Sequence, residues 1–231
     1  MSAILAVFNF IRHIDKELVT MTQTMGPSLY LVLFAIVFAE TGLVVTPFLP
    51  GDSLLFAIGV LCAMDPTELN VPAGGFMPSL PVVMVLLFAA AVLGDGVNYH
   101  VGRFLGPKVF NSEKSWLLNK KHLIKTQMFY EKYGNKAIIL ARFVPIVRTF
   151  APFVAGIGKM QYRRFVLFNI IGAAIWVTLL VPLGYFFAHT ETVKKHFELV
   201  ILAIVFLSVL PMIIEIGRGW LKGRAGAPAE G

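Results

Sequence analysis

Three apolar runs along this chain are long enough to cross a membrane as single helices. They cover residues 81–104, 165–188 and 199–217. The hydrocarbon core of a bilayer requires about 20 consecutive apolar residues in a helix. Residues 65–80 contain no lysine or arginine, whereas residues 103–136 are rich in both, so the positive-inside rule places the first loop outside the cytoplasm and the second inside it. The pattern therefore predicts a membrane protein with several crossings.

Two further apolar stretches, residues 28–63 and 137–158, are interrupted near their middle by polar residues and prolines. Proline cannot continue a helix, and the apolar halves on either side are each too short to cross a bilayer. Both stretches are therefore predicted to form re-entrant helical hairpins. The residues expected to shape these hairpins are Pro47, Pro50 and Gly51 in the first and Pro145, Pro152 and Gly156 in the second.

The same order of elements occurs twice along the chain. Residues 1–23 and 119–134 are expected to be interfacial helices, and each precedes a hairpin and a span. An odd number of crossings separates the two copies, so they should lie in opposite orientations. Parity places the N-terminus outside and the C-terminus inside, whereas Arg12 and Lys16 favour an N-terminus inside, so the orientation of the N-terminus stays open. The predicted fold is an all-α polytopic membrane protein, an inverted repeat with a final transmembrane helix. The predicted boundaries are a single membrane domain over residues 1–218 and a disordered tail over residues 219–231.

Composition agrees with this picture. Of the 231 residues, 57% are hydrophobic and only 14% are charged, which is more apolar than an average soluble domain. The net charge of +7 comes from basic residues between the apolar runs, which indicates contact with anionic headgroups and argues against nucleic acid. A single cysteine excludes an intrachain disulfide, and the histidines are scattered over different sides, so we expect no metal and no cofactor. No cleavable signal peptide is expected, because charged residues interrupt the first apolar stretch.

Four charged residues stand inside the interrupted stretches. Arg142 and Arg148 flank Pro145, while Glu40 and Asp52 lie in the first stretch. A charge at membrane depth costs about 2.5–3.5 kcal/mol on insertion scales, so opposite charges should lie together. We interpret the four residues as two halves of one buried site. The alternative is that they form structural ion pairs that only fix the hairpins together.

Other polar residues in the spans are expected to support this site. Asp95 and Tyr99 share one helical face and, with Arg103, form either a proton relay or a buried hydrogen-bonded contact. Asn169 is expected to satisfy a hairpin carbonyl across a helix interface. Trp176, on the same face as Asn169, is interpreted as a packing residue.

Three motifs in this order resemble the DedA family of inner-membrane proteins, whose eukaryotic relatives are the VTT-domain lipid scramblases. They are FLPGD, GDGVNYHVGR and RFVPIVRTFAPFVAG, followed by Asn169, Gly172 and Trp176. The resemblance covers residues 25–190. It implies two re-entrant hairpins that meet in the membrane, and transport or flipping of phospholipids or of the undecaprenyl phosphate carrier, linked to the proton motive force. Glu40, Asp52, Arg142 and Arg148 match the charged positions of the family.

This chemistry suits a lipid with a phosphate headgroup. Arginine presents forked donors that match a phosphate and keeps its charge at membrane depth. Glu40 and Asp52 would neutralise the arginines in the empty site, and one of them could take up a proton. The predicted function is a flippase in the bacterial inner membrane, with undecaprenyl phosphate, anionic phospholipids and protons as partners. The oligomeric state, monomer or homo-oligomer, is left open.

Two other functions compete with this one. A proton-coupled antiporter of small ions or drugs would also need intramembrane carboxylates, although the paired arginines would repel cations. A lipid phosphatase ranks last, because no serine, cysteine or histidine lies near the arginine motif to act as a nucleophile with its base. We therefore predict that the chain is not an enzyme.

Overall fold

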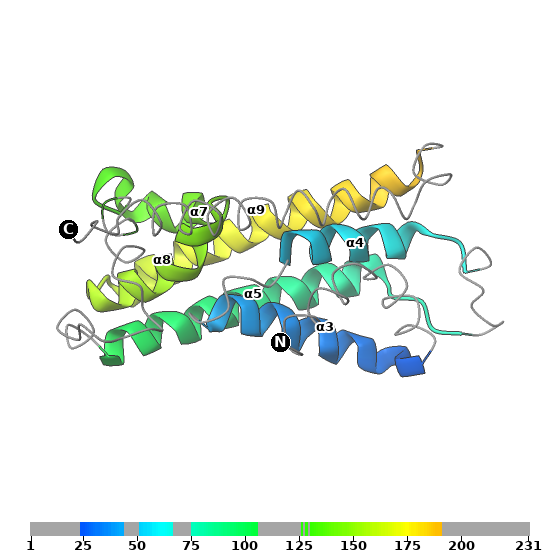
Figure 1. Cartoon of the computed structure of the whole chain (residues 1–231), viewed down its shortest axis with the longest axis horizontal. Coiled ribbons are helices and arrows are strands. Elements are labelled where there is room, and N and C mark those ends of the chain that lie inside the picture. Colours follow the sequence, from blue (N-terminus) through cyan, green and yellow to red (C-terminus); the bar gives the residue numbers. More distant parts are fainter. Residues whose placement is uncertain are drawn as a thin grey trace, which may run out of the picture.

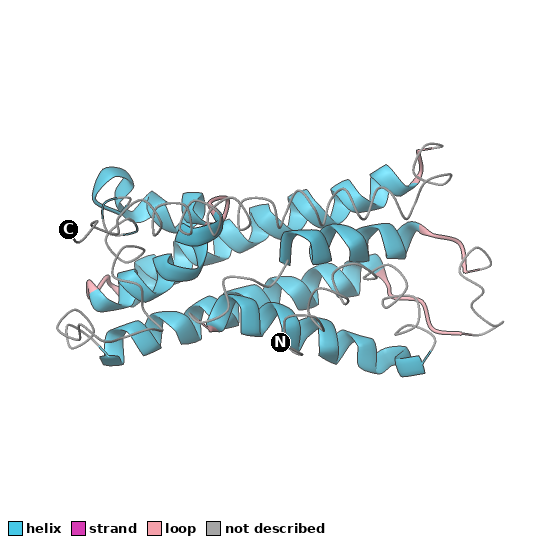
Figure 2. Cartoon of the chain, viewed as in Figure 1, coloured by secondary structure: helices cyan, strands magenta, loops and turns pink. Residues whose placement is uncertain are grey.

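The computed structural model of the chain describes residues 24–43, 51–66, 75–105, 126, 128 and 130–190. Every regular element in this part of the chain is a helix (Figure 2). The all-helical prediction is therefore confirmed for these residues. Several predicted features lie outside them, namely the interfacial helix at 1–23, Pro47 and Pro50, most of the helix at 119–134, the span at 199–217 and the tail at 219–231.

Two of the helices are long and apolar enough to span a membrane. They are α5 (Leu80–Leu105) and α9 (Tyr162–Ala188). The remaining helices are shorter. They are η1 (Gly26–Ser28), α3 (Leu29–Gly42), α4 (Gly51–Ala63), η3 (Gly134–Lys136), α7 (Ala137–Ala141) and α8 (Pro145–Ile157).

The break between α7 and α8 follows from a proline. Val144 adopts an extended conformation, with φ −118° and ψ 106°, and α8 begins at Pro145. A residue before proline is driven out of the helical region, whereas proline itself is favoured in the first turn of a helix. Pro152, expected to interrupt this stretch as well, lies inside α8, which continues to Ile157. Buried neighbours such as Phe150 and Phe153 hold the helix together despite the lost hydrogen bond.

The short helices form two pairs at opposite ends of the long ones (Figure 1). α3 packs against α5 and α4 against α9, while α8 packs against α5 and α7 against α9. Each pair thus contacts both long helices. The C-terminal end of α3 and the N-terminal ends of α4 and α8 lie near the middle of the long axis (Figure 1). This arrangement brings charged residues that are far apart in the sequence into one central layer.

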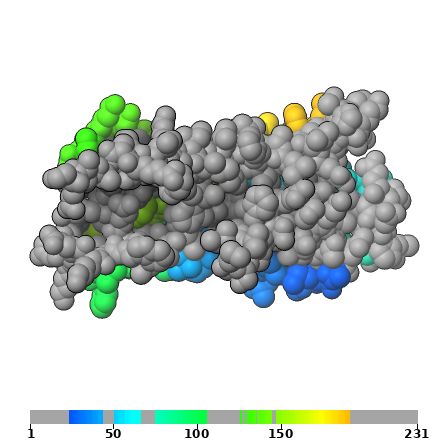
Figure 3. All heavy atoms as spheres, viewed as in Figure 1, coloured from blue at the N-terminus to red at the C-terminus, as the bar shows by residue number. Residues whose placement is uncertain are grey.

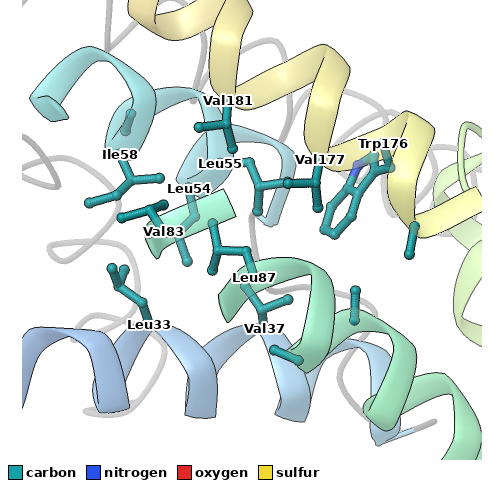
Figure 4. Packing of buried hydrophobic residues seen from close by; sticks show 14 of the residues in the cluster. Leu33, Val37, Leu54, Leu55, Ile58, Val83, Leu87, Trp176, Val177 and Val181 are labelled. Atoms are coloured by element: carbon teal, nitrogen blue, oxygen red, sulfur yellow. The ribbon is translucent and has the colours of Figure 1, made fainter. Parts of the chain in front are cut away.

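The main hydrophobic core fills the space between α3, α4, α5 and α9 (Figure 4). Leu33 and Val37 of α3 face Val83 and Leu87 of α5, and Leu55 of α4 lies nearby (Figure 4). Trp176 closes this core at its end toward the centre of the molecule (Figure 4). A second, smaller cluster at the other end contains Tyr99, Ile138 and Phe165.

The outward faces of the helices are apolar as well. Leu31 on α3, Val85 on α5 and Phe186 on α9 are each about seven-tenths exposed. Figure 3 shows α3, in blue, lying open along one long edge of the molecule. A helix that is hydrophobic on all sides is typical of a membrane span, and extended apolar surface is unusual on a soluble monomer. The exposed surface therefore fits a lipid environment.

Close contacts at glycines hold the short helices against the long ones. A Cβ atom on Gly102 of α5 would lie 2.9 Å from the carbonyl carbon of Phe153, and one on Gly156 of α8 would lie 2.7 Å from the backbone nitrogen of Arg103. Gly59 of α4 and Gly184 of α9 form a similar reciprocal contact at the other end. Such small residues let helix backbones approach closely.

Replacing Gly102 by Ala should lower the free energy of unfolding by about 1–3 kcal/mol, because the added methyl group pushes α8 away from α5. Gly96→Ala on the same helix is the matched control, since its Cβ would meet nothing nearer than the Tyr162 hydroxyl at 4.0 Å. Reversible denaturation in detergent micelles measures both variants. Equal stability of the two variants would contradict the close contact of α5 and α8.

Candidate functional site

Arg148 lies where the ends of three short helices meet. Its Nη1 donates to Oδ1 of Asp52 at 2.8 Å, and its Nη2 lies 3.2 Å from Oε1 of Glu40. Glu40 belongs to the last turn of α3, Asp52 to the first turn of α4, and Arg148 to the first turn of α8. The structure therefore brings Glu40, Asp52 and Arg148 together in one cluster.

The Glu40 side chain is fitted closely into this cluster. Its Oε1 also accepts a hydrogen bond of 3.2 Å from the backbone nitrogen of Gly51. A side chain at position 51 would overlap the Glu40 carboxylate, so Gly51 makes room for it. This contact joins the end of α3 to the start of α4 and fixes the carboxylate beside Arg148.

Trp176 of α9 completes the cluster. Its Nε1 donates to the same Asp52 Oδ1, at 2.7 Å, and the Arg148 guanidinium carbon lies 4.6 Å from the indole centroid. A guanidinium over an indole face is a favourable cation–π contact. The packing role expected for Trp176 is observed, but the sequence interpretation missed its hydrogen bond. Its position on the same face as Asn169 was the available signal.

Arg142 forms a second buried cluster. Its Nη2 donates to Oδ2 of Asp95 and, at 2.6 Å, to Oδ1 of Asn169. Asn169 in turn donates from Nδ2 to the carbonyl of Val92 at 3.0 Å. The structure therefore places Arg142 with Asp95 on α5 instead of with Glu40 and Asp52, and Asn169 bonds a carbonyl of a long helix instead of a hairpin carbonyl. The Trp176 ring lies 5.7 Å from the Arg142 guanidinium carbon, so it neighbours both arginines.

Asn98 joins the two short pairs. Its Nδ2 donates to the carbonyl of Thr41 on α3 at 3.0 Å and to the carbonyl of Thr149 on α8 at 2.9 Å. The side chain is fully buried. Sequence reasoning did not identify Asn98, although it follows Asp95 by one helical turn within the GDGVNYHVGR motif. The residue acts as a bridge between α3 and α8.

Tyr99 and Arg103 belong to a separate group near the end of α5. The Tyr99 hydroxyl donates to the carbonyl of Met160 and accepts from Arg103 Nη1 at 3.1 Å. The Tyr130 hydroxyl contacts Sδ of Met160 at 2.6 Å, and burial together with neighbouring Tyr99 raises the pKa of Tyr130. The Asp95 carboxylate pairs with Arg142, so Asp95 belongs to the second cluster.

The two clusters together hold the carboxylates of Glu40, Asp52 and Asp95 against the guanidinium groups of Arg142 and Arg148, which gives a net charge of −1 when all are ionised. Oε2 of Glu40, Oδ1 of Asn98 and Nε of Arg142 are buried and have no hydrogen-bond partner among the described residues. No group of three metal-binding side chains occurs in the described part of the chain.

An open groove of about 630 Å³ runs between α5 and α9 beside the second cluster. Its walls are mainly apolar, with residues such as Val97, Val101 and Val166. Asn169, which binds Arg142, forms part of the wall. The groove therefore places apolar surface next to a buried charged residue.

Replacing Asn98 by Leu, a side chain of similar size, should lower the free energy of unfolding by about 2 kcal/mol or more, because the two buried hydrogen bonds that join α3 to α8 through Asn98 are lost. Denaturation in detergent micelles measures the change. Thr178→Val is the control, since the Thr178 hydroxyl donates only to carbonyls of its own helix on an exposed face. A loss no greater than that of the control would show that Asn98 does not bridge α3 and α8.

Comparison with known proteins gives consistent matches. Residues 49–186 match the family model described as the VTT domain. The chain is 49% identical over 218 residues to the protein named DedA of Escherichia coli (strain K12), covering 94% of this chain and 95% of that protein. It is 41% identical over 196 residues to an uncharacterized membrane protein of Mycobacterium tuberculosis (strain ATCC 25618 / H37Rv), covering 85% and 82% respectively. It is 36% identical over 187 residues to the inner membrane protein YghB of Escherichia coli (strain K12), covering 80% and 78%. No solved structure matches the chain significantly.

Proposed function

This chain belongs to the VTT-domain family of DedA-like membrane proteins, and from that premise we propose that it moves lipids with a phosphate headgroup across a bacterial inner membrane. Undecaprenyl phosphate and anionic phospholipids are the proposed substrates. The observation that carries the proposal is Arg148, whose side chain is only 10% exposed at the junction of α3, α4 and α8 and whose partner Asp52 is about half exposed. An ionised side chain at membrane depth is costly, and such residues commonly mark substrate pathways.

We propose that the two short pairs are re-entrant hairpins of an inverted repeat. The helices α3 and α4 contain 14 and 13 residues. At about 1.5 Å per residue each is near 20 Å long, less than a hydrocarbon core of about 30 Å. The crossed packing of each pair on both long helices, with reciprocal glycine contacts at each end, supports the repeat. The substrate site then lies where the hairpins meet, near the midplane, as in other transporters of inverted-repeat design.

The chemistry of transfer follows from the Arg148 cluster. A phosphate headgroup binds the guanidinium through its forked donors. Because the five charged groups sum to −1, an incoming anion adds to a site that is already negative, and uptake of a proton offsets the added charge. Glu40 is the proposed proton acceptor, since it is buried and its Oε2 has no partner among the described residues. Movement of lipid is thereby linked to the proton motive force.

The lipid tails need no polar path. The apolar outer faces of α5 and α9 and the groove between them keep acyl or isoprenoid chains in an apolar environment while the headgroup crosses. The groove wall includes Asn169, so tails in the groove lie close to the Arg142 cluster. We propose that only the headgroup enters the central charged layer.

A second candidate is a proton-coupled antiporter of small ions or drugs. The net negative charge of the two clusters favours it, since a cation could exchange with a proton there. Both arginines, however, are held by carboxylates in the same layer and would repel a cation that entered it. Lipid phosphate is therefore the better fit.

Transfer in proteoliposomes tests the proposal. Purified protein is reconstituted with labelled undecaprenyl phosphate or labelled phosphatidylglycerol, with and without a pH gradient. We expect transfer above the rate of protein-free liposomes, accelerated by the gradient. Cation flux without any phosphate lipid would support the antiporter instead, and release of inorganic phosphate from the lipid would indicate an enzyme. Transfer at the protein-free rate for both lipids would overturn the proposed function.

A further inference from the structure

We propose that Asp52 substitutes for the substrate when no substrate is bound. Its Oδ1 then occupies the position that a phosphate oxygen of the bound substrate takes. Trp176 donates a hydrogen bond to whichever oxygen is present. The inference rests on the proposed function and deepens it. It assigns a phosphate-binding role to an indole and a gating role to a carboxylate.

The geometry at Asp52 carries the inference. One oxygen, Oδ1, accepts from Arg148 Nη1 at 2.8 Å and from Trp176 Nε1 at 2.7 Å. Two donors from different helices therefore converge on a single point that an anionic oxygen fills. A phosphate oxygen is also an anionic acceptor and forms the same short, charge-assisted hydrogen bonds.

Asp52 is the member of the cluster that can leave. Its side chain is 47% exposed, whereas the Glu40 side chain is 4% exposed and also accepts from the Gly51 backbone. When Asp52 swings outward, its carboxylate leaves the cluster through the side that is already exposed. Arg148 remains oriented, because Glu40 still binds Nη2 and the indole still contacts the guanidinium.

Trp176 is suited to the second donor position. Its indole N–H can only donate, so the buried ring requires an acceptor at this point in both the empty and the loaded protein. The ring is 1% exposed and is packed in the main core, which fixes the direction of the N–H (Figure 4). A fixed donor discriminates in favour of ligands that present an anionic oxygen to it.

Binding to an Asp52→Ala variant gives the first test. Calorimetry measures binding of phosphatidic acid in nanodiscs of phosphatidylcholine and, in a separate arm, of inorganic phosphate to protein in detergent. Removal of the internal competitor should tighten binding about tenfold or more, while transfer in proteoliposomes slows because release is impaired. Tightening in the nanodisc arm alone assigns the site to lipid headgroups, and tightening in both arms assigns it to phosphate in general.

Asp65→Ala is the matched control, since Asp65 is exposed and lies just beyond the other end of α4. Its affinity should equal that of the wild type. Asp52→Leu keeps a side chain of similar size without an acceptor oxygen, and it serves as a second variant if Asp52→Ala elutes as an aggregate. Unchanged or weaker binding by a folded Asp52 variant would overturn the inference.

Trp176→Phe tests the second donor and keeps an aromatic ring over Arg148. With Asp52 present, the substitution removes a hydrogen bond from both the empty and the loaded protein, so the affinity for phosphatidic acid should change little. In the Asp52→Ala background only the loaded protein loses a bond, and binding should weaken about tenfold or more. If Trp176→Phe changed the affinity for phosphatidic acid equally with and without Asp52, the proposed role of Trp176 would be wrong. If the variants showed the expected affinities but the wild type transferred no lipid, only the proposed function would be wrong.

Discussion

A double variant in which Arg148 is replaced by Met and Glu40 by Gln should fold like the wild type and transfer phosphate lipids no faster than protein-free liposomes. Removing Glu40 together with Arg148 leaves no buried charge unpaired, because the other partner of Arg148, Asp52, is 47% exposed and still accepts a hydrogen bond from Trp176. Replacing both partners of a buried ion pair is often neutral or stabilising. The amide oxygen introduced by Glu40→Gln can still accept the hydrogen bond that the Gly51 backbone donates to Glu40. Transfer is lost because the headgroup loses its guanidinium. Folding is followed by gel filtration and thermal denaturation in detergent, and transfer by the liposome assay.

The double variant distinguishes a role of Arg148 in headgroup binding from a purely structural role. If the arginine only fixed the hairpins together, a stable double variant would transfer lipid at the rate of the wild type. Arg163→Met is the matched control, because Arg163 is exposed at the start of α9, and it should retain transfer. Full transfer by the double variant would therefore rule out Arg148 as the headgroup ligand.

Arg142→Met alone should lower the free energy of unfolding by about 3–5 kcal/mol, the usual cost of breaking a buried ion pair from one side. Asp95 would be left almost fully buried, with a side-chain exposure of 7%, and Asn169 Oδ1 would lose its donor. Denaturation in detergent micelles measures this change. Arg142 thus differs from Arg148, whose partner Asp52 is 47% exposed.

Adding Asp95→Asn to Arg142→Met tests the cause of that loss. The second substitution removes the unpaired carboxylate, so most of the stability should return. Arg163→Met again controls for removal of a positive charge, and it should unfold like the wild type. A single Arg142→Met variant as stable as the wild type would show that the Arg142 and Asp95 pair contributes nothing to the fold.

Much of this molecule follows from its sequence. The apolar runs predict the two long helices, and the proline at position 145 predicts the break before α8. The cost of an isolated charge in an apolar stretch predicts that Glu40, Asp52 and Arg148 should find one another, and the structure places them in contact. These inferences need only the approximate depth of each residue in the membrane and its charge, and both can be read from the order of apolar and charged residues in the sequence.

The sequence pattern does not determine which carboxylate pairs with Arg142, because this depends on the direction of its side chain in the fold. α7 has only five residues, and the turn that follows it sets the direction in which Arg142 leaves the helix. That direction points at Asp95 and Asn169 on the long helices. A charge balance alone allows Glu40 or Asp52 equally well as partners, so the sequence could not choose among the three carboxylates.

The hydrogen bonds of Asn98 and Trp176 were missed for a related reason. An amide or an indole in an apolar span is interpreted as a packing or capping residue unless its acceptor is known. The acceptors of Asn98 are backbone carbonyls 57 and 51 residues away, and that of Trp176 is a carboxylate 124 residues away. Only the three-dimensional arrangement of the helices reveals these bonds.

The same type of reciprocal glycine contact occurs at two places in the molecule. Gly102 and Gly156 allow the backbones of α5 and α8 to approach closely, and Gly59 and Gly184 do the same for α4 and α9. The two contacts are alike in geometry but have different neighbours. A methyl group added at Gly102 and another at Gly184 report on the same helix separation in independent surroundings. Agreement between them would assign the effect to the shared geometry, and a difference would measure how much the surroundings of each contact contribute.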